Sequence, residues 1–223
     1  MNARVERGFA VGFALLLVVS MGTAGVTLAT SPAAAQGDTT STATVSDAFE
    51  AYDIGASDPG PWTAASDTSG NEIVGDSFLG DRALEVTDSD GEAIYESATV
   101  DSSDAAIQAV VRGTNSGGYI EFGGVTLELN TGEFTNRLRL ADSTGEVIID
   151  DVAPSEGEWA NVELIADGGD LEATTWAVGT EKPESPDIEL SGVDTTGDLE
   201  VSTVNTNDVF TIDEVSVQPY STL

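Results

Sequence analysis

One carboxylate is singled out by the pattern of the residues around it. In the segment 209–217 the apolar positions run through Phe210 and Ile212 and then shift to Val215 and Val217. A β-bulge at Asp213 would produce such a shift and would turn its side chain inward. A buried carboxylate requires a metal ion or hydrogen-bond donors, so the sequence leaves both a metal site and a purely structural bulge open.

Aromatic residues are the second set that could do chemistry, because a sugar ring stacks on an exposed aromatic face beside polar groups. Trp62, Tyr119 and Trp176 are the candidates for a glycan site. Alternation places Trp176 on the polar face of its segment, and Tyr119 shares a face with Glu121. Aromatic residues in β-sandwiches more often pack in the core, and we expect this of Trp159, which begins a segment.

The chain contains no histidine and no cysteine. It therefore lacks the usual imidazole base and the usual transition-metal ligand. Disulfides, thiolate nucleophiles, zinc–thiolate sites and lipid attachment through a cysteine are also excluded. These absences remove many enzyme classes.

The elements that must position these residues are short β-strands. Apolar and polar residues alternate clearly in 125–130, where Val125, Leu127 and Leu129 share one face. Glycine-containing turns separate twelve such segments, and none carries a sustained helical stripe. We predict an all-β fold, an antiparallel two-sheet jelly-roll sandwich of about a dozen strands. The predicted strands are 82–87, 93–98, 105–112, 119–122, 125–130, 135–140, 146–150, 161–166, 171–178, 188–190, 199–204 and 209–217.

One hairpin is predicted in register. A turn around residues 130–133 puts Glu128 opposite Arg137 and Thr126 opposite Arg139. We interpret the two arginines as part of a salt-bridged sheet surface, in which exposed pairs contribute about 0–1 kcal/mol. The alternative is a site for an anion or a carboxylated sugar.

A series of short motifs follows one another along the chain in a recognisable order. They are Phe49-Glu50 with Trp62, then 80–86, 159–164, the turn 167–170, 171–179, Pro183 and Pro186, 197–201 and 209–217. In this order the sequence resembles concanavalin A-like lectin/glucanase jelly rolls, particularly laminin-G-like modules, over about residues 47–220. The resemblance implies two packed antiparallel sheets and does not decide function.

The resemblance also bears on catalysis and calcium. Glucanases of this group carry E-x-D-x-x-E on one strand, and this chain has no E-x-D, so catalysis of that kind is disfavoured and no catalytic residue is assigned. Calcium-containing jelly rolls also open on Phe-Glu and close on Ile-Asp-x-Val. That likeness implies that Glu50 lies beside Asp213, and the two are the candidate ligands of a structural calcium ion. Residues 88–92 match part of an acidic calcium loop, although an acidic turn explains them more simply.

The balance of charge is strongly acidic, with 40 Asp and Glu against 7 Lys and Arg, a net charge of −33. Such a lysine-poor surface resembles those of proteins from extreme halophiles. At molar salt the Debye length is about 3 Å, so self-repulsion is largely screened. This charge makes nucleic acid and anionic lipid poor partners.

The N-terminal residues are predicted to direct export. Residues 1–36 combine Arg4 and Arg7, an apolar stretch over 9–21 and an A-x-A-like end at 33–35, as in a cleavable signal peptide. A membrane anchor is the alternative if the segment is retained. Cleavage removes one acidic residue and two arginines, which leaves 39 acidic and five basic residues and a net charge of −34. Residues 37–46 read as a Thr/Ser-rich disordered linker.

We therefore predict a secreted or surface-associated, non-catalytic binding or structural module that contacts extracellular polysaccharide or glycan. One alternative is a divergent carbohydrate-active hydrolase or lyase. The other is a cell-envelope structural protein without a small ligand.

Overall fold

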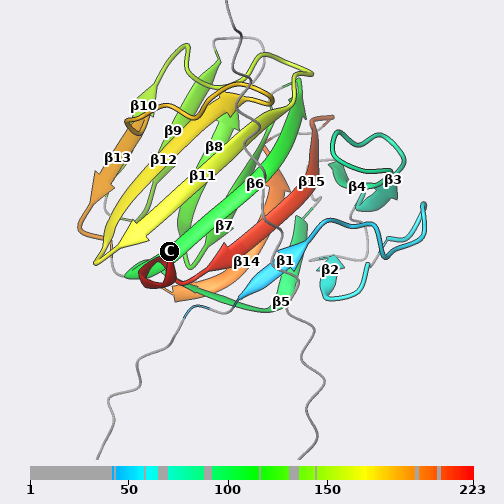
Figure 1. The fold of residues 1–223 in the computed structure, drawn as a ribbon, viewed down its shortest axis with the longest axis horizontal. Coiled ribbons are helices and arrows are strands. Elements are labelled where there is room, and N and C mark those ends of the chain that lie inside the picture. The colour runs from blue at the N-terminus through cyan, green and yellow to red at the C-terminus, as the bar shows by residue number, and fades with distance from the viewer. Residues whose placement is uncertain are drawn as a thin grey trace, which may run out of the picture. The chain divides into compact units, whose positions relative to one another are not determined.

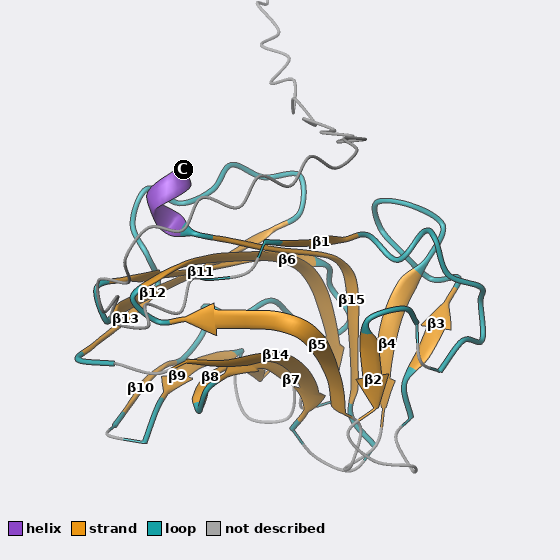
Figure 2. Cartoon of the chain, turned by 90° about the horizontal axis from the view of Figure 1, so that it is seen from below, coloured by secondary structure: helices purple, strands orange, loops and turns teal. Residues whose placement is uncertain are grey.

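Two antiparallel β-sheets face each other in the computed structural model of the protein (Figure 1 and Figure 2). The structure describes residues 42, 44–57, 59–64, 70–87, 92–115, 117–130, 136–143, 145–193, 196–204 and 207–223. They all belong to one compact unit within residues 38–223.

The first sheet has eight strands and contains the bulged C-terminal strand β15 (Val209–Gln218) at its centre. Its order is β13-β12-β11-β6-β15-β4-β3, and β1 pairs with the second half of β15. The other strands of this sheet are β1 (Val45–Asp47), β3 (Glu72–Val74), β4 (Ala83–Thr87), β6 (Asp104–Thr114), β11 (Ala160–Asp167), β12 (Asp170–Ala177) and β13 (Ile188–Ser191).

The second sheet has seven strands in the order β10-β9-β8-β7-β14-β5-β2. A short 3₁₀ helix, η1 (Tyr220–Thr222), follows β15. The strands are β2 (Trp62–Ala64), β5 (Glu92–Asp101), β7 (Gly118–Phe122), β8 (Val125–Asn130), β9 (Arg137–Ala141), β10 (Glu146–Ile149) and β14 (Thr196–Thr203).

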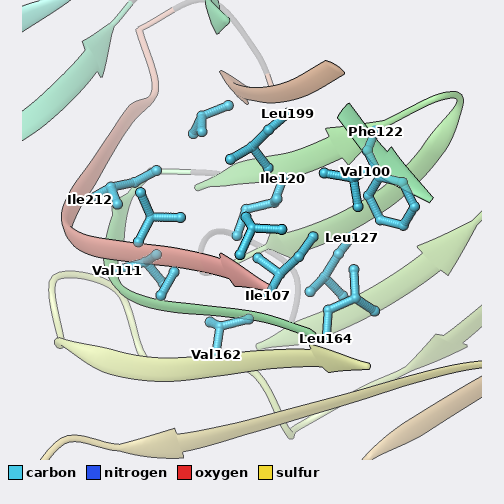
Figure 3. Close-up of a cluster of buried hydrophobic side chains, with 14 of the residues drawn as sticks. Val100, Ile107, Val111, Ile120, Phe122, Leu127, Val162, Leu164, Leu199 and Ile212 are labelled. Atoms are coloured by element: carbon cyan, nitrogen blue, oxygen red, sulfur yellow. The ribbon is translucent and has the colours of Figure 1, made fainter. Parts of the chain in front are cut away.

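The core lies between the sheets and is built from alternate residues of each strand. In the eight-stranded sheet, Ile107 and Leu164 are among the residues that point inward, and in the other sheet Leu127 and Leu199 do (Figure 3). Each is at most 1 % exposed. Burying a side chain of this size stabilises the fold by about 1.5–3 kcal/mol, so the alternation specifies which face of each sheet is internal.

The twelve strands predicted from alternation are all present, and the predicted all-β sandwich is confirmed. The sequence does not predict β1, β2 and β3. Each has only three residues, which is too short for a period of two to be recognised.

The predicted register of the β8–β9 hairpin is wrong by two residues. Glu128 pairs with Arg139, and Asn130 pairs with Arg137. A shift of two leaves every side chain on the same face, so the alternation that predicts the strands does not distinguish the two registers. The turn residues 131–135, on which the predicted register depends, lie outside the described residues.

Strand β1 begins at Val45, near the end of the predicted linker, and its residues pair with β15 from Val217 back to Val215. The predicted signal segment, residues 1–36, lies outside the described residues. Among the residues that are described, no helix is long and apolar enough to span a bilayer.

Trp62 is a core residue. Its side chain has no exposed surface, and its ring centroid lies 5.7 Å from that of Phe49 and 5.1 Å from that of Tyr95. Its Nε1–H donates a hydrogen bond of 2.9 Å to Asp47 Oδ2. A side chain without exposed surface offers no face to a sugar, which corrects the expectation that Trp62 contacts a glycan.

Replacing Trp62 should therefore affect stability. We expect Trp62→Ala to lower the free energy of unfolding by about 3–5 kcal/mol, because it removes a buried ring and leaves a cavity. Trp176→Ala is the matched control, since the half-buried Trp176 loses less packing. Urea unfolding at molar salt measures both changes, and equal losses for the two variants would contradict the assignment of Trp62 to the core.

Candidate functional site

The predicted bulge in the last strand is present at Asp213. The pairing of β15 with β6 shifts register between Ile212 and Glu214, and Asp213 is only 1 % exposed. Its Oδ2 accepts hydrogen bonds from the backbone N–H groups of Phe78, at 2.6 Å, and of Leu79. The donors that this buried carboxylate requires are thus supplied by residues 76–82, which we call the anchored loop.

Glu50 holds the other end of the anchored loop. Its Oε1 accepts hydrogen bonds from the backbone N–H groups of Asp81, at 2.7 Å, and Arg82, at 3.0 Å. The Arg82 guanidinium donates in return to the backbone carbonyl of Glu50. A Cβ at Gly80 would lie 1.9 Å from Glu50 Oε1, so this close approach requires glycine at position 80.

These contacts satisfy the two carboxylates without a cation. The oxygens Asp213 Oδ2 and Glu50 Oε1 each accept two backbone N–H hydrogen bonds, which favour the charged form of a carboxylate without a metal ion. Among the described residues, no group of three or more acidic side chains could hold a metal ion. Most of the second calcium candidate, residues 88–91, lies outside the described part of the chain. Calcium binding by Glu50 and Asp213 stays a prediction, and the geometry favours the structural interpretation of the bulge.

The anchored loop places an aromatic side chain beside Trp159, which immediately precedes β11 of the eight-stranded sheet. Phe78 is 50 % exposed, and its ring centroid lies 6.4 Å from that of Trp159. Asp76 at the start of the loop forms an ion pair of 2.9 Å with Arg112 of β6. The Arg112 guanidinium in turn lies over the Trp159 ring, 4.6 Å from its centroid. The Asp76–Arg112 ion pair and the Asp213 hydrogen bonds thus help to orient the rings of Trp159 and Phe78.

A groove of about 440 Å³ opens where β11 begins and β12 ends. Its volume falls within the range of about 300–1,000 Å³ that is usual for small-ligand sites. Val178 N–H donates to the Trp159 carbonyl, and Trp176 pairs with Asn161. Trp159 and Trp176 therefore lie diagonally across two adjacent strands. The lining residues are Phe78, Val152, Pro154, Gly157, Glu158, Trp159, Ala160, Thr175, Trp176, Ala177 and Val178.

The predicted sugar-stacking residues do not form one site. Trp176 lines the groove, on the eight-stranded sheet. Tyr119 lies in β7 of the seven-stranded sheet, between the inward-facing Gly118 and Ile120, so its side chain points outward from the opposite layer. The structure therefore keeps Tyr119 and Trp176 apart.

Sequence reasoning misses Phe78 and misjudges Trp159. Phe78 sits in an irregular loop, where no periodicity indicates which way a side chain points. Trp159 is expected in the core, yet it is only half-buried and lines the groove. Its position just before β11 is visible in the sequence, but the residues that its ring contacts, Phe78 and Arg112, are far from it along the chain.

The two arginines of the β8–β9 hairpin are paired with carboxylates. Arg139 forms ion pairs with Glu128, at 3.1 Å, and Glu146, at 2.7 Å. Arg137 pairs with Asp150 at 3.0 Å. The hydrogen bond with Glu146 raises the pKa of Arg139 further above its ordinary value. These contacts are those of a salt-bridged sheet surface.

A half-buried carboxylate lies two strands from Arg112. Glu85 of β4 pairs with Thr211 of β15, which in turn pairs with Arg112. Burial raises the pKa of the Glu85 carboxyl above its ordinary value; Arg112 opposes this, and the nearby Glu72 and Asp76 add to it. The charged form of Glu85 is therefore disfavoured in the folded protein.

Replacing Asp213 tests the role of the bulge. We expect Asp213→Ala to lower the free energy of unfolding by about 2–3 kcal/mol, because two N–H groups of the anchored loop lose their acceptor. Glu214→Ala, at the neighbouring half-buried position, is the control and should change stability by less than about 0.5 kcal/mol. A calcium-dependent rise in the wild-type melting midpoint that Asp213→Ala abolishes would instead support the metal site.

The raised pKa of Glu85 predicts a pH-dependent effect. A carboxyl whose folded pKa exceeds its unfolded pKa contributes stability that is present at low pH and lost as the pH rises through the folded value. Glu85→Gln should therefore raise the melting midpoint at neutral pH, and the difference should vanish below about pH 4. Glu189→Gln on the exposed face of β13 is the control. A lower midpoint for Glu85→Gln at neutral pH would mean that attraction to Arg112 outweighs burial.

Comparison with known proteins places the fold. No family model and no curated protein match the sequence. The lumenal domain of VIP36 aligns with a TM-score of 0.50 and 9 % identity over 74 % of this chain and 86 % of that domain. Domain 4 of AbnA, an extracellular arabinanase of Geobacillus stearothermophilus, aligns at 0.50 and 13 % identity over 80 % and 93 % of the two chains. A glycosyl hydrolase family 16 protein of Mycobacterium smegmatis aligns at 0.50 and 12 % identity over 78 % and 99 %. At such identities the likeness establishes the fold alone: the chain has the concanavalin A-like jelly-roll fold that its sequence resembles.

Proposed function

We propose that this protein is a secreted, non-catalytic module that binds extracellular polysaccharide or glycan in the groove lined by Phe78, Trp159 and Trp176. The observation that carries the proposal is the presence of three partly exposed aromatic side chains around one groove of about 440 Å³. Partly exposed aromatic side chains leave apolar surface in contact with water, which is unfavourable. A cluster of them on the surface therefore favours a ligand-binding role.

The chemistry of the groove suits sugar rings. The C–H groups on one face of a pyranose or furanose pack against an aromatic ring, while the hydroxyls at its rim need polar partners. The exposed Glu158 lines the groove, and Asn161 pairs with Trp176 on the next strand. Apolar rings with a few polar groups beside them are typical of a ligand site.

Proteins of similar fold support the proposal by analogy. The VIP36 domain has been solved in a form bound to Ca²⁺ and Man3GlcNAc, and the AbnA domain in complex with arabinotriose. Because one fold hosts many functions, these ligands only motivate the choice of sugars as probes. The role of calcium in this chain is a separate question, because the groove residues do not include Glu50 or Asp213.

Export and adaptation to high salt are parts of the same proposal. A net charge of −33 with 7 basic residues suits a protein that stays soluble where salt screens repulsion. Extracellular polysaccharide is the ligand class that a secreted module with an aromatic groove would meet.

A carbohydrate-active enzyme is the second candidate, favoured by one observation. Glu200 of β14 pairs directly with Glu121 of β7, so two carboxylates are neighbours on the seven-stranded sheet. Retaining glycosidases use two carboxyl groups about 5–5.5 Å apart. If the second candidate is correct, sugar release from a polysaccharide would be lost in Glu121→Gln.

Glycan binding at molar salt tests the proposal. We expect tryptophan fluorescence titration and pull-down on insoluble polysaccharide to detect binding. Trp176→Ala and Trp159→Ala should each weaken it about three- to tenfold through the lost stacking. Tyr119→Ala, on the other sheet, is the matched control and should leave the affinity unchanged.

Two results would contradict the proposal. One is a loss of binding in Tyr119→Ala but not in the groove variants, which would move the site to the seven-stranded sheet. The other is release of soluble sugar during incubation, which would replace a binding module with an enzyme.

A further inference from the structure

We infer that the groove accepts uncharged glycan chains and discriminates against chains that carry carboxylate or sulfate groups. This inference rests on the proposed function and names the class of sugar that the groove would take. It follows from which charges of the described residues remain available to a ligand.

Among the described residues, the only charged side chain that lines the groove is an acid. Glu158 is exposed in the segment that leads into β11. Glu156, two residues before it, is also exposed, and its carboxylate accepts a hydrogen bond from the Asn115 backbone N–H. A sugar carboxylate that entered the groove would therefore meet negative charge first.

The cation nearest to the groove is already committed. Arg112 stacks on Trp159 and forms an ion pair with Asp76, and its side chain is only 16 % exposed. Recognition of a carboxylate or sulfate by arginine uses the planar N–H fork of the guanidinium. Here one nitrogen of that fork is bonded to Asp76 and one face of the guanidinium covers the indole, so Arg112 supports the aromatic ring instead of binding an anion.

The other basic residues of the described structure are also engaged. Lys182 forms an ion pair with the buried Glu163. Arg82 donates to the Glu50 carbonyl, and Arg137 and Arg139 pair with acids on the seven-stranded sheet. None of these basic residues lines the groove, so a polyanion bound there gains no direct cationic partner, whereas an uncharged chain requires none.

Salt does not remove this discrimination. At molar salt the Debye length is about 3 Å, so the long-range field of the acidic surface is screened. A sugar anion inside the groove still lacks a direct cationic partner and loses its hydration there. Stacking of an uncharged ring involves no ion pair, and salts that are excluded from apolar surfaces strengthen it.

Matched pairs of polysaccharides test the inference, because the two members of each pair differ mainly in charge. Dextran is compared with dextran sulfate, and carboxyl-reduced polygalacturonate with polygalacturonate. Laminarin, mannan and arabinan extend the uncharged set. Affinities are measured for the wild type, for Trp176→Ala and for Glu158→Gln at several salt concentrations from about 1 M upward.

We expect the wild type to bind at least one uncharged chain, and to bind its charged counterpart at least about tenfold more weakly. Affinity for the uncharged chain should stay constant or rise with salt. Glu158→Gln should reduce the difference in affinity between the charged and the uncharged chain of a matched pair. Trp176→Ala should lower the affinity for the uncharged chain.

The contrary outcomes separate the inference from the function on which it rests. Binding of a charged chain as tight as that of its uncharged counterpart, and lost in Trp176→Ala, would overturn the inference and leave the glycan-binding groove standing. Binding that falls steeply with salt would do the same, since it would reveal an ion-pair contact. No binding to any chain would overturn both.

Discussion

The contact on which the site depends is the pair of hydrogen bonds from the anchored loop to the buried carboxylate of Asp213. The bulge between Ile212 and Glu214 turns this carboxylate toward residues 76–82. A buried acid without donors would be costly, so the bulge and the loop each require the other. Through this contact the central strand of the larger sheet determines where Phe78 lies, and thereby one wall of the groove.

A second chain of contacts also positions aromatic side chains at the groove. Asp76 pairs with Arg112, which stacks on Trp159, and the ring of Phe78 lies beside Trp159. Acids and bases that would otherwise belong to a solvated surface are thus used to orient aromatic rings. In a chain with only 7 Lys and Arg residues, the stacking of Arg112 on Trp159 uses a charge that could have attracted anions.

The sequence predicts the framework of the fold well and the site only in part. Period-two alternation identifies the long strands because each strand buries one face, and the loss of phase at Asp213 reveals the bulge for the same reason. The three-residue strands and the register of the β8–β9 hairpin escape prediction, because alternation is blind to short elements and to shifts of two.

The candidate site escapes for a different reason. The place of Trp176 on the polar face of a strand identifies it from the sequence. The places of Phe78 and Trp159 at the groove, in contrast, depend on tertiary contacts with Asp213 and Arg112. Alternation shows that an aromatic side chain points outward but does not show to which sheet its strand belongs. Tyr119 and Trp176 are therefore grouped together in the sequence, although they lie on different sheets. Trp62 lies in a strand of three residues, which is too short to show alternation, so its burial cannot be predicted from the sequence.

A double-mutant cycle on glycan affinity tests most directly whether Asp213 shapes the groove by holding Phe78. Affinity for an uncharged chain that the wild type binds is measured for Phe78→Ala, for Asp213→Ala and for the double variant, under conditions where all remain folded. We expect strong coupling: Phe78→Ala should weaken binding in the wild type and should change the affinity little when Asp213 is already replaced by alanine. Independent, additive effects of the two substitutions would contradict it.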